Sequence, residues 1–273
     1  MSSDNRSEET ERPRPLVMRG DPRDQRQPQN AFLPSTAQNL LNCLVACGAL
    51  IATGCNSGDQ TAPWPARVER IVGEARYTSN NGADWAAVAT GTILSEGSVV
   101  QTALGDRNYV DLVLGDGTRK DGTPGKTAKA DRDRVRLHGD TVLGIDQRAA
   151  RSAGPGWSMQ TQLDLRKGRI TGRVKHLEAG SAYEIRYPRG VTGFRESGVV
   201  YDMRWADRLS DGETNPPCVL SLLSGAAVFV PAGTNANPTV IPAGFTFDDR
   251  TAALTPLSEP ARKELAATVD SLP

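Results

Sequence analysis

The sequence predicts an all-β domain over residues 66–248, made of many short antiparallel strands and followed by a short C-terminal helix. Three observations predict this fold class. Apolar and polar residues alternate with period two in short runs, which is typical of half-buried strands. Glycine or proline bounds most of these runs, as tight turns require. Hydrophobic residues make up 38% of the chain but aromatic residues only 5%, so we expect a mainly aliphatic core.

The clearest alternating runs lie at residues 109–114, 134–138, 159–165 and 169–175. Lys167 and Gly168 separate the last two runs, so we expect a hairpin there. Residues 183–187 continue the series until Pro188, which lacks a backbone donor and therefore marks a strand end or edge. Further strands are expected at residues 199–204, 219–223, 226–230 and 245–247.

Residues 115–134 are polar and rich in glycine, which favours a long exposed loop over a strand. Asp131 and Asp133 lie near its end. A calcium loop of the EF-hand type would need further acidic residues at fixed offsets and a distal Glu, which this segment lacks. These carboxylates are therefore interpreted as a solvated charge run, and no metal is expected.

The first 65 residues divide into three segments. Residues 1–39 are polar, lack apolar periodicity and are expected to be disordered. Residues 40–55 are uncharged and mostly apolar; they are too short to span a bilayer, which needs roughly 20 residues, but suit a secretory signal. Residues 56–65 then form a polar tether of small residues.

The signal segment ends in Ala52-Thr53-Gly54-Cys55, which resembles a bacterial lipobox. In that motif small residues admit the peptidase, and the cysteine thiol receives a diacylglyceryl group. We therefore expect Cys55 to be the lipid attachment site of a lipoprotein anchored on the periplasmic side of the cell envelope. An uncleaved signal anchor and a buried helix of a cytosolic protein are the alternatives. A start at Met18 would shorten the long region before the apolar run.

Within residues 249–273 the sequence has the features of a helix. Ser258 can cap its start, and Pro260 falls in the first turn, where its missing donor is harmless. One helical face carries Ala261, Leu265, Thr268 or Val269, and Leu272. We expect this face to pack on the sheet.

Charge and cysteine content exclude several classes of function. The chain has 32 basic and 32 acidic residues, so no broad field would attract nucleic acid. Three of its four cysteines (Cys43, Cys47, Cys55 and Cys218) lie in or beside one apolar segment, so no disulfide framework follows. Cys43 and Cys47 lack a second ligand pair nearby, so neither a metal nor another cofactor is expected.

Catalytic motifs are equally missing from the sequence. The only imidazoles are His138, on the polar face of the 134–138 run, and His176, after the 169–175 run; both are interpreted as solvated turn residues. Cys218 leads into an apolar strand, where burial raises the pKa of a thiol, and is interpreted as an inert core residue. No G-x-S-x-G elbow, H-E-x-x-H helix or phosphate-binding glycine loop occurs. We therefore expect no catalytic residues; the alternative is a periplasmic hydrolase with an unrecognised site.

Ordered landmarks along residues 66–248 resemble the FecR domain family. They are Val72-Gly73-Glu74 before Trp85, the element 91–102, the strand and turn at 112–117, residues 165–168, residues 183–191, and residues 222–228 with Pro242-Ala243-Gly244. After Arg195 the chain has Glu196-Ser197 where the family commonly has Gly-Thr. The role of that turn therefore does not carry over.

The resemblance implies strands wound as a twisted β-solenoid-like or sandwich-like stack, and the pattern does not separate the two. It also implies an envelope sensor, scaffold or binding module in signal transduction. Our own hypothesis is that this module contacts another envelope protein through a sheet edge or the Gly115 to Arg134 loop. The best-known members also carry a helical anti-sigma segment, for which residues 1–38 are too short and polar. We therefore expect a stand-alone FecR-like module.

Overall fold

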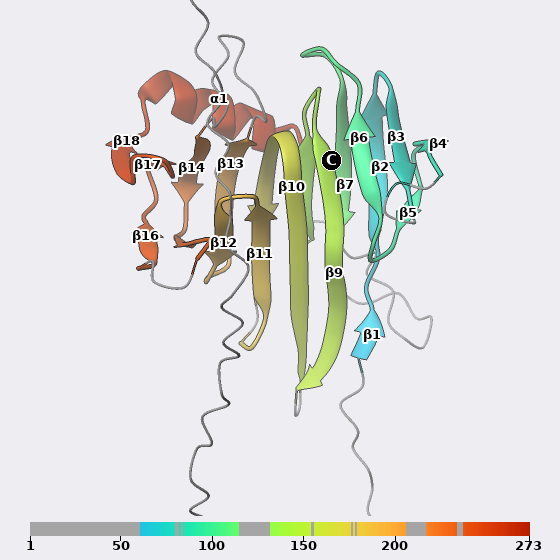
Figure 1. Ribbon diagram of the computed structural model, residues 1–273, viewed down its shortest axis with the longest axis horizontal. Coiled ribbons are helices and arrows are strands. Elements are labelled where there is room, and N and C mark those ends of the chain that lie inside the picture. Colours follow the sequence, from blue (N-terminus) through green and yellow to red (C-terminus); the bar gives the residue numbers. More distant parts are fainter. Residues whose placement is uncertain are drawn as a thin grey trace, which may run out of the picture. The chain divides into compact units, whose positions relative to one another are not determined.

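The computed structural model describes residues 61–79, 82, 84–114, 132–153, 156–175, 177, 179–205, 217–233 and 237–273, which belong to one compact unit, residues 55–273. Strands dominate these residues, and one short helix lies near the C-terminus (Figure 1). The all-β prediction is therefore confirmed. The extension 1–39, the signal segment with Cys55, His176 and most of the loop expected at 115–134 lie outside the described residues.

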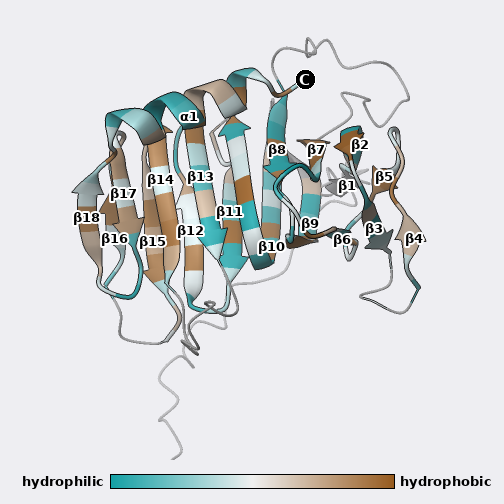
Figure 2. Ribbon diagram, turned by 90° about the horizontal axis from the view of Figure 1, so that it is seen from above, coloured by the Kyte–Doolittle hydropathy of each residue, from teal (hydrophilic) through white to brown (hydrophobic). Residues whose placement is uncertain are grey.

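The strands form two sheets, A and B, that lie face to face (Figure 2). Sheet A has the order β4-β3-β6-β9-β10-β11-β12-β15-β16, with β1 beside the end of β9. Its strands are β1 (Thr61–Pro63), β3 (Ala75–Thr78), β4 (Ala86–Ala87), β6 (Val99–Thr102), β9 (Val142–Ala153), β10 (Gly156–Val174), β11 (Ala182–Tyr187), β12 (Gly190–Phe194), β15 (Ala227–Pro231) and β16 (Thr239–Ile241).

Sheet B has the order β5-β2-β7-β8-β10-β13-β14-β17-β18. Besides β10 its strands are β2 (Ala66–Val72), β5 (Ile93–Leu94), β7 (Tyr109–Leu114), β8 (Asp133–Leu137), β13 (Val199–Trp205), β14 (Cys218–Ser224), β17 (Phe245–Asp248) and β18 (Ala253–Pro256). After β10 the chain alternates between sheets in pairs of strands. The stack therefore has sandwich-like layers. Its described pairings are antiparallel except for β10 with β11.

Strand β10 belongs to both sheets. Its residues up to Lys167 pair with β9, whereas residues from Gly168 onward pair with β13 and, in part, with β8. Gly168 has a φ of 99°, and a side chain there would overlap Thr141, so glycine allows the strand to bend from one sheet to the other. The hairpin predicted at Lys167 and Gly168 is therefore wrong, because this glycine marks a bend in a continuous strand.

The core lies between the two sheets and joins them. Aliphatic residues such as Leu112 and Leu143 are buried in it, as the composition predicts. The few aromatic residues gather in the C-terminal half, where the rings of Phe194 and Tyr201 stack 4.8 Å apart. Inside the core, one of the hydroxyl groups of Tyr183 and Tyr201 donates a hydrogen bond to the other, at 2.9 Å. Each large buried side chain contributes about 1.5–3 kcal/mol to folding.

Helix α1 (Glu259–Asp270) confirms the predicted C-terminal helix. The Ser258 hydroxyl accepts a hydrogen bond from the amide of Ala261, and Pro260 lies in the first turn. Leu265 and Val269 are buried against sheet B, on its side away from sheet A (Figure 2). None of the helical segments among the described residues has the length and apolar composition of a membrane span.

Candidate functional site: the outer face of sheet B

A row of polar side chains crosses seven strands on the outer face of sheet B. Side chains alternate between the two faces of a strand, so residues paired at outward positions form a line across the sheet. The registers place one outward polar residue on each of β2, β7, β8, β10, β13, β14 and β17. In that order, this polar row consists of Arg70, Asp111, Arg136, Thr171, Asp202, Ser221 and Thr246.

A buried carboxylate anchors the first part of the polar row. The Asp111 side chain is 1% exposed and accepts hydrogen bonds from Arg136 at 2.7 and 2.9 Å and from Arg70 at 2.8 Å. The Arg136 guanidinium also lies over the Tyr109 ring, 4.3 Å from its centroid. Two guanidinium groups thus compensate one desolvated charge, and removing the carboxylate would leave Arg136 buried without its partner.

In the middle of the polar row, Thr171 and Asp202 form a series of hydrogen bonds with the neighbouring His138 and Arg169. The Thr171 hydroxyl donates to Asp202 at 2.7 Å, and His138 Nε2 lies 2.8 Å from the same hydroxyl. Because that hydroxyl has given its one proton to the carboxylate, Nε2 of His138 must be the donor. Arg169 donates to the same Asp202 oxygen at 2.7 Å. These hydrogen bonds place the proton of the neutral His138 imidazole on Nε2.

His138 is half-buried rather than a solvated turn residue, which corrects the expectation from its place at a strand end. Burial, followed by the positive charge of Arg169, lowers the pKa of His138 from 6.5 to about 4. The imidazole is therefore neutral near pH 7. The sequence did not reveal this environment, because Thr171 and Asp202 lie on other strands.

Helix α1 lies across this face and contacts it by charge as well as by apolar packing. Glu264 accepts a hydrogen bond from Arg169 at 3.1 Å, and Asp270 accepts one from Arg173 at 3.4 Å. At the end of the helix, Ser271 accepts hydrogen bonds from Arg136 through its hydroxyl and from Arg70 through its carbonyl. Exposed ion pairs of this kind contribute only about 0–1 kcal/mol each.

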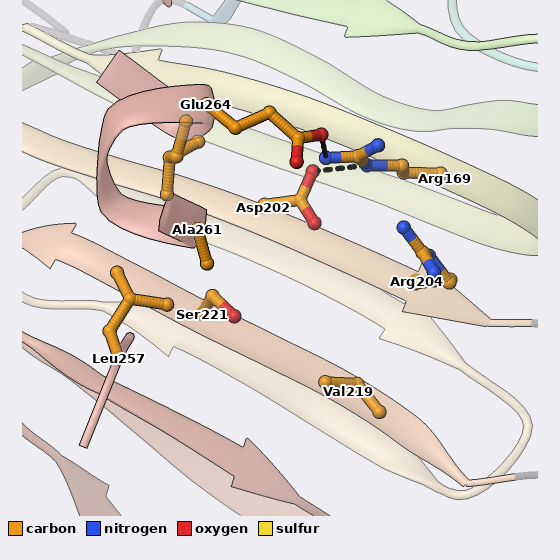
Figure 3. Close-up of a pocket in the computed structure, with 9 residues that line it drawn as sticks. Arg169, Asp202, Arg204, Val219, Ser221, Leu257, Ala261 and Glu264 are labelled. Carbon is orange, nitrogen blue, oxygen red and sulfur yellow. Dashed lines mark hydrogen bonds and ion pairs between the residues drawn. The ribbon is translucent and has the colours of Figure 1, made fainter. Parts of the chain in front are cut away.

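A pocket of about 220 Å³ remains between the first half of α1 and the sheet (Figure 3). Its walls come from β10, β13, β14, the segment before α1, and α1 itself; they are Arg169, Asp202, Arg204, Val219, Ser221, Leu257, Ala261, Glu264 and Leu265. Arg204 makes no hydrogen bond or ion pair with any described residue, whereas Arg169 is paired with both Asp202 and Glu264. The pocket therefore combines apolar side chains with two arginines and two carboxylates. Among these charged groups Arg204, which is exposed, has no ionic partner in the described residues.

The chemistry of this face suits the binding of carboxylates. Arg169, Arg173 and Arg204 project from two neighbouring strands, with Asp202 between them. The carboxylates of α1 neutralise part of this excess positive charge. No group of three or more His, Cys, Asp or Glu that could hold a metal occurs among the described residues.

Cys218 lies in the core, as the sequence predicts. It is a free thiol with 1% exposure, and burial raises its pKa well above the usual value. Asp249 accepts hydrogen bonds from the Cys218 amide and from Arg189, both at 2.8 Å. These contacts fix the start of β14.

The outer face of sheet B carries Arg70, Arg136, Arg169, Arg173 and Arg204, and we call it the arginine-rich face. The sequence alone did not predict that these arginines share one surface. The alternation at residues 134–138 and 169–175 did place Arg136 and Arg173 at polar positions of their strands. Their partners, such as Asp111 and Asp270, lie far away in the sequence, and a single sequence does not show strand register. The expected lipid site Cys55 lies outside the described residues.

Comparisons with known proteins assign the chain to no family. No family model matches it, and no curated protein matches it. Two crystal structures of a "putative anti-sigma factor" from Parabacteroides distasonis ATCC 8503, at 1.65 and 2.50 Å resolution, are similar to it with TM-scores of 0.37 and 0.33. Their identities are 11% and 12%, and the matches cover 62% and 59% of this chain. The matches cover 64% of each of those chains, which is less than two thirds of their length. Because this structural similarity is weak, the FecR-like resemblance rests on the sequence landmarks.

Proposed function

We propose that this chain is an exported, membrane-anchored, FecR-like binding module of the bacterial cell envelope. It acts as a sensor or scaffold through contact with another envelope protein, and not by catalysis. The lipobox-like Ala52-Thr53-Gly54-Cys55 supports export and anchoring, with the lipid on Cys55. The ordered landmarks in residues 66–248 support the FecR-like assignment.

The observation that carries the proposal is a group of four valines on the outer face of sheet A, of which two are exposed and two half-buried. Val228 pairs with Val240, and Val230 pairs with Val191, so the four side chains share one face across β12, β15 and β16. Val230 is 40% exposed and Val240 is 62% exposed. We call these four residues the valine patch. Clustered exposed apolar side chains are a feature of protein interaction surfaces.

The strand that carries Val240 also limits how a partner could bind. β16 pairs only with β15 among the described residues, so it is an edge strand. Pro238 and Pro242 flank it and lack the backbone donors that an added strand would use. Contact through side chains is therefore favoured over strand addition.

Co-isolation from chemically crosslinked envelopes tests the contact. We expect Val240→Lys to reduce recovery of the bound envelope protein at least tenfold, because it places a charge in an apolar contact. Leu104→Lys is the matched control, since Leu104 is 77% exposed on the turn after β6. Equal recovery from wild type and Val240→Lys would contradict the role of the valine patch.

Metabolic labelling with a radioactive fatty acid tests the anchor separately. We expect label on the wild-type protein and none on Cys55→Ala. Equal labelling of both proteins would end the lipoprotein proposal, and it would leave the contact at the valine patch to be judged by co-isolation alone.

A further inference from the structure

Helix α1 packs on the outer face of sheet B through only two buried side chains. Leu265 and Val269 are its buried side chains, and they pack on Val200 and Leu223. The carboxylates that reach the sheet belong to side chains that remain 62% exposed at Glu264 and 78% exposed at Asp270. A helix of 12 residues is also marginal when separated from its support. Its release from the face would leave the two-sheet core in place.

The contacts of α1 show what kind of element the face recognises. Arg169 and Arg173 on β10 each bind a carboxylate of the helix. Arg70 and Arg136 bind the backbone carbonyl and the hydroxyl of Ser271, at the end where the helix dipole is negative. The complementary partner is therefore a helix with an apolar stripe, acidic side chains and its C-terminus directed toward β2 and β8.

The pocket under the first half of α1 shows that this helix does not use the whole face. Exposed Arg204 lines the pocket without an ionic partner among the described residues. The helix contributes Ala261, Glu264 and Leu265 to the pocket, and its one carboxylate there, on Glu264, is paired with Arg169 (Figure 3). A carboxylate at position 261 would add a negative charge to the pocket that Arg204 also lines. The face thus offers one cation more than its own helix satisfies.

We propose that the outer face of sheet B is a docking site for an acidic amphipathic helix of a partner protein. In the free protein α1 occupies this site as a weak intramolecular ligand, and the partner helix displaces it. The partner helix carries a further carboxylate that pairs with Arg204. This surface is on the opposite sheet from the valine patch, so the inference does not depend on the proposed function.

Fluorescence anisotropy with labelled helix peptides tests the proposal in the full chain. The first probe is a peptide with the sequence of residues 256–273, and the second carries Ala261→Glu. Leu265→Asp with Val269→Asp releases α1 in the protein, and circular dichroism checks that the strands persist. We expect this released variant to bind the first peptide at least tenfold more tightly than wild type, because its own helix no longer competes.

The second peptide tests the role of Arg204. We expect Ala261→Glu to tighten binding to the released variant at least threefold, and we expect Arg204→Ala in the protein to abolish that gain. Arg250→Ala is the control, because Arg250 lies outside the pocket. A gain that persists in Arg204→Ala would overturn the assignment of this residue.

Hydrogen exchange of the wild-type chain gives a second test if the released variant fails to fold. Excess Ala261→Glu peptide should raise exchange at residues 259–270 at least fivefold and leave β13 and β14 protected. Unchanged exchange at saturating peptide would overturn the proposal. Concentration-dependent dimers formed by exchange of α1 would also overturn it, because the occupant would then be a second copy of this chain.

Discussion

At the scale of single residues, His138 links protonation to folding. Its folded pKa of about 4 lies below its unfolded value near 6.5, so the unfolded chain binds more protons between these pH values. Stability therefore rises with pH through this window and falls as the pH drops from about 6.5 to about 4. Between these pH values, this one group lowers the free energy of unfolding by up to about 3 kcal/mol.

We predict that His138→Gln removes this part of the pH dependence, because a glutamine amide can still donate to Thr171 but does not titrate. Urea unfolding of both proteins at pH 7, 5.5 and 4.5 measures the effect. As the pH falls, the free energy of unfolding should decrease more for wild type than for the variant. Parallel pH curves for the two proteins would contradict the assigned environment of His138.

Gly172 is a second single position with a clear physical constraint. It lies on β10 opposite Tyr201, and a methyl group there would overlap the tyrosine ring. We predict that Gly172→Ala lowers the free energy of unfolding by about 1–3 kcal/mol, the usual cost of overpacking a core. Thermal unfolding measures this loss.

Gly193→Ala is the matched control for Gly172→Ala. Gly193 also lies in a strand, and a methyl group there would meet no atom closer than 4.0 Å. We expect this control to unfold at the wild-type temperature or slightly above it. Equal losses in the two variants would show that contact with Tyr201 is not the cause.

At the scale of elements, the docking of α1 can be separated from the stability of the sheets. Truncating a buried leucine costs about 2–5 kcal/mol, and here that loss falls on a helix with two buried side chains. We predict that Leu265→Ala raises hydrogen exchange at residues 259–270 by at least tenfold while β10 stays protected. Uniformly faster exchange across α1 and β10 would instead show that the helix and sheets unfold as one unit.

The elements also show where sequence reasoning succeeds and where it fails. The cap at Ser258, the first-turn Pro260 and the apolar stripe predicted α1, because these signals are local. The prediction of a hairpin at Lys167 and Gly168 is wrong, since the same residues suit both a turn and a bend between two sheets. The pairing of Gly168 on β10 with Trp205 on β13, which lies far away in the sequence, decides between the turn and the bend.

At the scale of the whole molecule, alternating hydrophobicity is enough to predict two faces for each strand, and hence an all-β core. It does not predict which outward residues become neighbours. Arg70 and Ser271 are 201 residues apart in the sequence and are joined in space by strand order and the docking of α1. The arginine-rich face and the valine patch could therefore be found only once the registers were known.

The claim that this chain works by contact at an exposed valine patch is tested most directly by site-specific photo-crosslinking in living cells. A crosslinking residue at position 240 is compared with one at position 104, which is more exposed but lies on a different turn. We predict one crosslinked envelope protein from position 240 and none from position 104. The same products from both positions, or none from either, would contradict the account.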